Sequence, residues 1–84
     1  MTPKEERAVV SRINPEFTVH MKKQVVLDYP RFRDSESYDE TTIRTELARL
    51  KEAIADAIHT GEHTEDLLVR REVLYLLAED KGLM

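Results

Sequence analysis

The sequence predicts an all-α fold, in which an antiparallel helical hairpin carries one or two short N-terminal helices packed on it. Three observations favour this class. Charged residues make up 36% of the 84 residues, with only two glycines and three prolines, which is a composition typical of helices. Apolar residues recur at spacings of three and four over long stretches. Gly61 separates two such stretches and marks the turn between them.

The first helix is expected over residues 3–12. Thr2 can accept a hydrogen bond from an unpaired amide of the first turn, and Pro3 stands where a missing N–H does no harm. Glu5 can reach back toward the cap. Asn14 ends this helix, because the following proline disfavours helical angles at its position.

A second helix is expected over residues 15–28, with Asn14 as its cap and Pro15 in its first turn. Three apolar residues fall at i, i+4 and i+8, as a helix requires: Phe17, Met21 and Val25. The dense β-branched residues leave a strand as the alternative over 17–29, although no turn residue separates two strands. The helix is expected to end at Tyr29-Pro30, before a polar loop over residues 30–39.

The hairpin is the clearest element, with arms over residues 40–60 and 64–81. Ser37 and Glu40 fit the S-x-x-E capping pattern. The first arm carries one narrow apolar stripe: Ile43, Leu47, Leu50, Ile54 and Ala57. Thr64 is expected to cap the second arm.

The last helix is apolar around most of its circumference. A broad face carries Leu67, Val73, Leu74 and Leu77, and further apolar residues lie outside it: Leu68, Val69, Tyr75 and Leu76. One narrow-striped arm cannot cover so much surface. We therefore expect a second copy of the chain, most simply in a two-fold dimer, to bury part of it. The alternative is a cover formed by residues 3–29 of the same chain.

Charge divides the single domain 1–84 into basic N-terminal helices (1–33), a linking loop (34–39) and the hairpin (40–81). Residues 1–33 hold seven Lys/Arg and four Asp/Glu, a net of +3, whereas residues 34–84 hold six and thirteen, a net of −7. The halves can attract one another or meet different partners.

Arg70 and a set of basic residues in the N-terminal half are candidates for binding. Arg70 falls inside the apolar face of the last helix, where it must pair with a carboxylate or lie along apolar surface. We expect it to fix helix or dimer packing, with an anionic ligand at a dimer interface as the alternative. The YPRFR segment (29–33) joins aromatics to Arg31 and Arg33, as single-stranded nucleic-acid sites do, and Lys22 and Lys23 lie a short way upstream. The overall charge of −4 opposes that hypothesis.

Other chemistry is sparse. His59 and His63 flank Gly61 in HTGEHT, but a metal site needs three or four ligands and the chain has no cysteine, so we interpret the motif as a helix-capping turn. No phosphate-binding loop or nucleophile motif occurs, so we expect no enzymatic activity and no cofactor. The charged first residues and the lack of long apolar runs predict a soluble cytoplasmic protein without membrane contact.

The prediction for function is a small helical module that binds itself and another protein, as adaptor, regulator or inhibitor. The residues expected at its interface are Leu68, Val69, Arg70, Tyr75 and Leu76. A regulator that binds nucleic acid through its basic half is the alternative from a different class.

Overall fold

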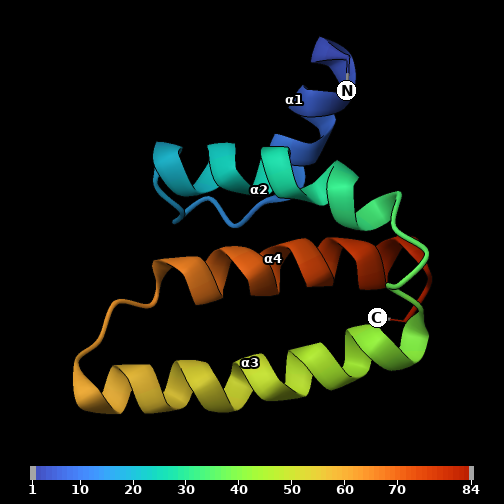
Figure 1. Cartoon of the computed structure of the whole chain (residues 1–84). Helices are drawn as coiled ribbons and strands as arrows, with labels where there is room; N and C mark the ends of the chain where they lie inside the picture. The colour runs from blue at the N-terminus through green and yellow to red at the C-terminus, as the bar shows by residue number, and fades with distance from the viewer. Residues whose placement is uncertain (1, 84) are drawn as a thin grey trace.

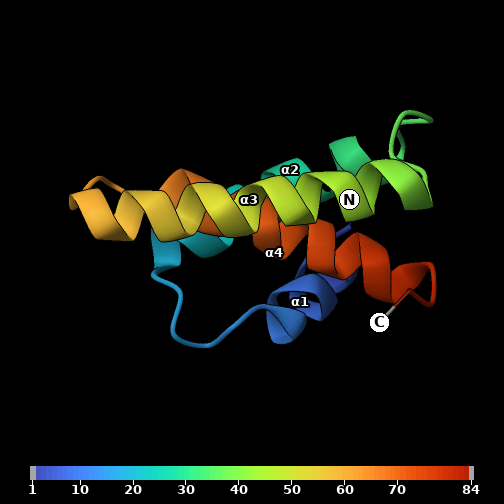
Figure 2. The ribbon, with the colours of Figure 1, turned by 90° about the horizontal axis from the view of Figure 1, so that it is seen from below.

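The computed structural model of the chain describes residues 2–83. These residues form α1 (Pro3–Arg12), α2 (Val19–Arg33), α3 (Glu40–Thr60) and α4 (Glu65–Asp80), and no strand occurs among them. The all-α prediction with its α3–α4 hairpin is therefore confirmed, and the strand alternative for residues 17–29 is wrong. α4 lies between α2 and α3, antiparallel to α3 and parallel to α2, and α1 projects beyond this layer (Figures 1 and 2).

α4 forms the centre of the molecule. It packs against α2 on one flank and α3 on the other, and Val73, Leu74, Leu76 and Leu77 are at most 2% exposed. Buried side chains from all four helices and from the segment between α1 and α2 form one core: Val9, Ile13, Phe17, Met21, Val25, Tyr29, Ile43, Leu50, Ile54, Val69, Val73, Leu74, Leu76, Leu77 and Ala78. The cover that α4 requires thus comes from the N-terminal half of its own chain, which was the alternative to a second copy.

The start of α2 differs from the prediction. Thr2 caps α1 as expected, accepting a hydrogen bond from the Glu5 amide at 3.2 Å. Asn14 does not cap a helix at residue 15, because its side chain instead accepts from the Glu16 amide at 2.9 Å in a local turn. Thr18 caps α2 by accepting from the Met21 amide at 3.2 Å.

The end of α2 also differs, because the helix continues through Pro30 to Arg33. A proline late in a helix removes one N–H donor, and packing can offset that loss. Here Tyr29 is buried against the core, while Phe32 stacks on Tyr38 with ring centroids 4.6 Å apart. The Asp34 amide closes the last turn by donating to the Pro30 carbonyl at 3.0 Å. The predicted loop over 30–39 therefore shortens to the residues after Arg33.

The hairpin has the predicted arms with different caps. Asp39, rather than Ser37, caps α3 by accepting from the Thr42 amide at 2.8 Å. Gly61 ends α3 at φ +76°, the left-handed geometry that glycine adopts without steric cost. Thr64 occupies the predicted N-cap position of α4 and its carbonyl accepts from the Leu68 amide at 2.9 Å, but its side chain forms no hydrogen bond to the first turn. Within residues 2–83 no helix combines the length and hydrophobicity needed to cross a lipid bilayer.

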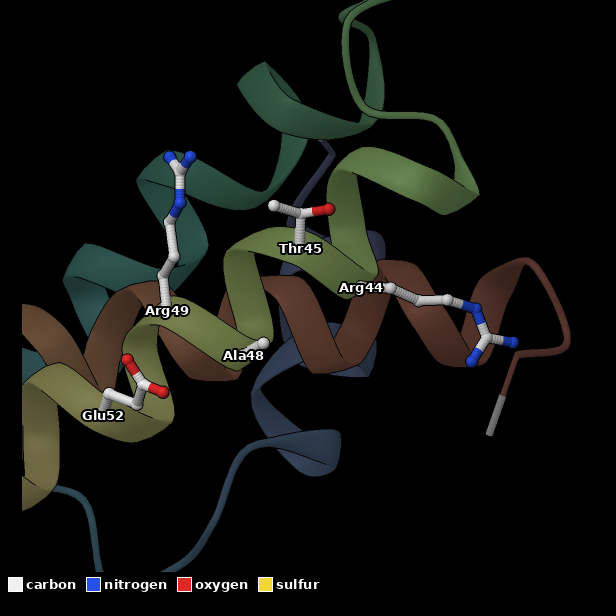
Figure 3. A pocket seen from close by; sticks show the side chains of 5 residues that line it. All are labelled: Arg44, Thr45, Ala48, Arg49 and Glu52. Atoms are coloured by element: carbon white, nitrogen blue, oxygen red, sulfur yellow. The ribbon is translucent and has the colours of Figure 1, made fainter.

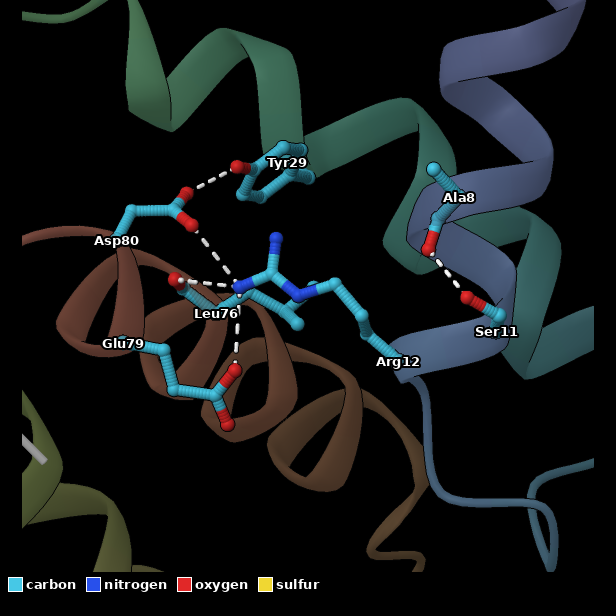
Figure 4. A network of polar contacts seen from close by, with 7 residues as sticks. All are labelled: Ala8, Ser11, Arg12, Tyr29, Leu76, Glu79 and Asp80. Atoms are coloured by element: carbon cyan, nitrogen blue, oxygen red, sulfur yellow. Dashed lines mark hydrogen bonds and ion pairs between the residues drawn. The ribbon is translucent and has the colours of Figure 1, made fainter.

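A polar network ties α1, α2 and α4 together (Figure 4). Arg12 Nη2 donates to the Leu76 carbonyl at 3.3 Å, to Glu79 Oε2 at 3.1 Å and to Asp80 Oδ1 at 2.9 Å. The Tyr29 hydroxyl donates to the second oxygen of Asp80. Partial burial alone would lower the pKa of Arg12, but its hydrogen bonds to Glu79 and Asp80 outweigh burial and raise it. The network fixes the C-terminal end of α1 on α4.

The same network predicts a loss of stability at alkaline pH. Burial raises the pKa of Tyr29, the Asp80 carboxylate raises it further, and Arg12 opposes part of the shift. Because the folded pKa lies above the unfolded one, this contribution to stability is complete below pH about 10 and is lost as pH rises through the folded pKa. The free energy of unfolding, measured by denaturant titration from neutral to alkaline pH, should show this decline. The decline should be smaller in Tyr29→Phe and should persist in Tyr38→Phe, which keeps the Tyr29–Asp80 contact. Equal declines in both variants would contradict this cause.

Candidate functional site

Most of the large exposed apolar side chains among residues 2–83 belong to α1 and α2. Val10 is 37% exposed, Val19 71% and Leu27 58%. Outside these two helices only Ile58 on α3, at 67%, is comparable among the described residues. The surface that lacks a cover within the chain is therefore on α2 and α1, whereas the sequence had directed attention to α4.

α2 carries apolar residues on two opposite sides. Met21, Val25 and Tyr29 fall at i, i+4 and i+8 and are buried. Val19 and Leu27 are spaced by eight residues and lie on the opposite side of the helix, with the exposed Lys23 between them. Helices that bury only one stripe usually present polar residues on the other. The sequence contains both apolar stripes of α2, but only the structure shows which of the two stripes packs against α4.

A groove runs between α1 and α2, and we call it the α1–α2 groove. Its volume is about 270 Å³, and apolar atoms dominate its lining. The lining residues are Glu6, Val10, Val19, Lys22, Lys23 and Val26. A second hollow of about 380 Å³ lies along α1 and shares Glu6 and Val10 with the groove. The two hollows thus meet at Val10.

The charge around the α1–α2 groove is mainly positive. Lys22 is half-buried and Lys23 exposed, and neither forms an ion pair with any residue of 2–83. Arg7 adds a third cation along α1, and Glu6 is the one acidic residue in the lining. An apolar floor with unpaired cations at its edge favours a ligand that is itself apolar and acidic.

α1 forms one wall of the groove although little of it is buried. Residues 2–8 are exposed throughout, and Val9 is the single buried residue of the helix. An isolated helix of ten residues is marginal in water, so most of its stability must come from packing. The contacts of Val9 and Arg12 provide that packing only at the C-terminal half of α1.

The residues expected at an interface on α4 do not form one exposed patch. Leu76 and Val69 are 1% and 5% exposed, buried inside the chain. Leu68 and Tyr75 are half-buried, and the Arg71 guanidinium lies over the Tyr75 ring at 5.7 Å. Burial of Leu76 and Val69 by this chain removes the reason for assigning them to a dimer contact.

Arg70 lies at the surface. Its guanidinium sits over the Phe32 ring at 5.5 Å, next to Asp28 and Asp66 in a shallow recess of about 280 Å³. Of the two expected environments, Arg70 forms no ion pair with a carboxylate among residues 2–83 and instead lies against an aromatic side chain of α2. This contact joins α2 to α4.

The cations proposed for nucleic acid fall in two places. Lys22 and Lys23 line the α1–α2 groove, whereas Arg31 is exposed near the end of α2. Arg33 pairs with Asp34 at 3.1 Å and lies over the Tyr29 ring at 5.5 Å. The aromatic rings of YPRFR are engaged within the chain, since Tyr29 is buried and Phe32 stacks on Tyr38.

Two further features carry no chemistry. His59 and His63 flank the α3–α4 turn, and residues 2–83 contain no group of three or more side chains placed to hold a metal ion. A hollow of about 450 Å³ lies on the outer face of α3 (Figure 3). It is shallow, and Arg44, which pairs with Glu40 at 3.1 Å, points away from Arg49. Its side chains do not converge on a common point.

Comparison with known proteins found no matching family model, no similar curated protein and no similar solved structure. The α1–α2 groove and its surroundings are therefore the features of the molecule that bear on its function.

Proposed function

We propose that the protein is a binding module that recognises another protein through the α1–α2 groove and catalyses no reaction. It would act as an adaptor, regulator or inhibitor. The observation that carries the proposal is the pair of exposed apolar side chains that line the groove from its two helices, Val10 at 37% and Val19 at 71% exposed. Clustered apolar residues at the surface of a small protein are typical of protein–protein contacts.

The loosely packed α1 supports the same proposal. A short helix with Val9 as its single buried residue gains packing when a partner covers the exposed flank. Fully burying a side chain such as Val19 against a partner contributes about 1.5–3 kcal/mol, enough for a few anchors to hold a complex.

A matched pair of variants tests the proposal. Val10→Gln/Val19→Gln removes the exposed apolar residues that line the groove, and Ile58→Gln removes an exposed apolar residue of α3. Immobilised wild-type protein is expected to retain a saturable partner from an extract of its source cells, and the Ile58→Gln variant should retain it too. The groove variant should lose it. Identical retention by all three proteins, or loss with Ile58→Gln alone, would contradict the assignment of the groove.

Self-association is measured separately. Sedimentation equilibrium of the wild type should give the 9.8 kDa monomer at micromolar concentration. A dimer that dissociates in Val10→Gln/Val19→Gln would identify the partner as a second copy of the chain.

A further inference from the structure

We propose that the occupant of the α1–α2 groove is an acidic amphipathic helix of another protein, an inference that rests on the function proposed above. The spacing of the apolar residues in the groove and the charge at its rim each restrict what the groove can bind.

The spacing fits a helix. Val19 and Val26 are seven residues apart, which is two helical turns or about 10.5 Å along α2. Val10 of α1 lies across the groove from them, so the apolar floor is bounded by two helices. Grooves of this kind accept a third helix, which inserts apolar residues at i, i+3 or i+4, and i+7.

The charge fits acidic residues beside those anchors. Lys22 and Lys23 lie between Val19 and Val26 along α2 and have no ion-pair partner among residues 2–83. An incoming helix that places Glu or Asp next to its apolar anchors pairs with both lysines. Opposite charges at the rim accelerate association and select the partner.

A second copy of this chain meets these requirements less well. It is acidic overall, with a charge of −4, but outside α1 and α2 its exposed large apolar residues reduce to Ile58 among the described residues. One exposed isoleucine does not form the two-turn stripe that the groove requires. Nucleic acid fits the lysines but gains nothing from the apolar floor.

Selection from a displayed library tests the inference directly. The probe is a library of randomised helical peptides of about 15 residues, roughly four turns, selected on wild-type protein. Peptides that also bind Val10→Gln/Val19→Gln, in which two lining residues are changed, are removed by counter-selection. The enriched peptides are expected to carry net negative charge and apolar residues at i, i+3 or i+4, and i+7. In spectra of the labelled protein they should shift the methyl signals of Val10, Val19 and Val26.

Charge reversal supplies the control. Lys22→Glu/Lys23→Glu should weaken binding of an enriched peptide about tenfold or more, and added salt should reduce that difference. The matched variant Arg49→Glu/Lys51→Glu, which changes net charge equally on exposed α3 residues, should bind nearly as the wild type does. A peptide with lysine in place of its acidic residues should recover binding to Lys22→Glu/Lys23→Glu.

The outcomes separate the two proposals. Enriched peptides that occupy the groove but are neutral or basic would overturn the acidic partner and leave the binding function intact. If no peptide is enriched, both proposals are overturned. Peptides whose affinity is the same for the wild type and for every groove variant would also overturn both proposals. An oligonucleotide that competes with the peptides at physiological salt and loses affinity with Lys22→Glu/Lys23→Glu would place nucleic acid in the groove instead.

Discussion

Replacing Leu74 by alanine is expected to destabilise the protein by about 2–5 kcal/mol, the range measured for large-to-small changes in closed cores. Leu74 has no exposed surface and lies on the helix that packs between α2 and α3. Helices on both flanks limit how far the cavity can collapse, and limited collapse raises the cost. A domain of 84 residues has about 4–13 kcal/mol of total stability, so this one change removes a large share of it.

Thermal and urea melts measure the effect. The melting temperature should fall by about 4–8 °C for each kcal/mol lost in a domain of this size. Leu74→Met, which conserves volume, should cost less than about 1.5 kcal/mol, and Ile58→Ala on the exposed side of α3 should stay within about 0.5 kcal/mol. A loss below about 1 kcal/mol for Leu74→Ala would show that α4 is not enclosed by its own chain.

Replacing Arg12 by alanine is expected to cost about 1–2 kcal/mol and to release α1 in particular. The side chain is one-third exposed, so solvent screening reduces the value of each ion pair. Arg12 nevertheless bonds to three groups of α4, and its loss leaves Asp80 with only the Tyr29 hydroxyl. Since Val9 is the only residue that α1 buries, little else holds that helix in place.

Hydrogen exchange distinguishes local release from general weakening. Amides of α1 should exchange much faster in Arg12→Ala, while those of α3 should follow only the global change in stability. Arg44→Ala is the matched control, because it removes an exposed i,i+4 ion pair with Glu40 and should cost about 0.3–0.5 kcal/mol. Uniform acceleration in every helix would contradict an anchoring role for Arg12.

The sequence predicted the elements that depend on local chemistry. α1 and α3 have the expected bounds, because the cap at Thr2 and the left-handed Gly61 are determined by neighbouring residues. The bounds of α2 were wrong at both ends. Its continuation past Pro30 accompanies contacts with α4, in which Tyr29 bonds to Asp80 and Arg70 lies over Phe32, and no local pattern reveals these contacts.

The candidate site was harder to predict than the fold. The apolar surface of α4 indicated that a cover was needed, but the sequence left open whether α2 or a second chain supplies it. Assigning α2 to that role buries Met21 and Val25 and leaves Val19 and Leu27 on the outside. Lys22 and Lys23 were chosen in the sequence for their charge, and the structure adds the apolar residues beside them.

The parallel pairing of α2 with α4 also implies an order of assembly during folding. Tyr29 and Asp80 are 51 positions apart along the chain, whereas residues 61–64 alone connect α3 to α4. Closing a short loop costs less chain entropy than closing a long one, so the hairpin is expected to nucleate first and α2 to dock later. Until α2 docks, the leucine-rich flank of α4 stays open to water, and that intermediate is the species most prone to aggregate in a newly synthesised chain.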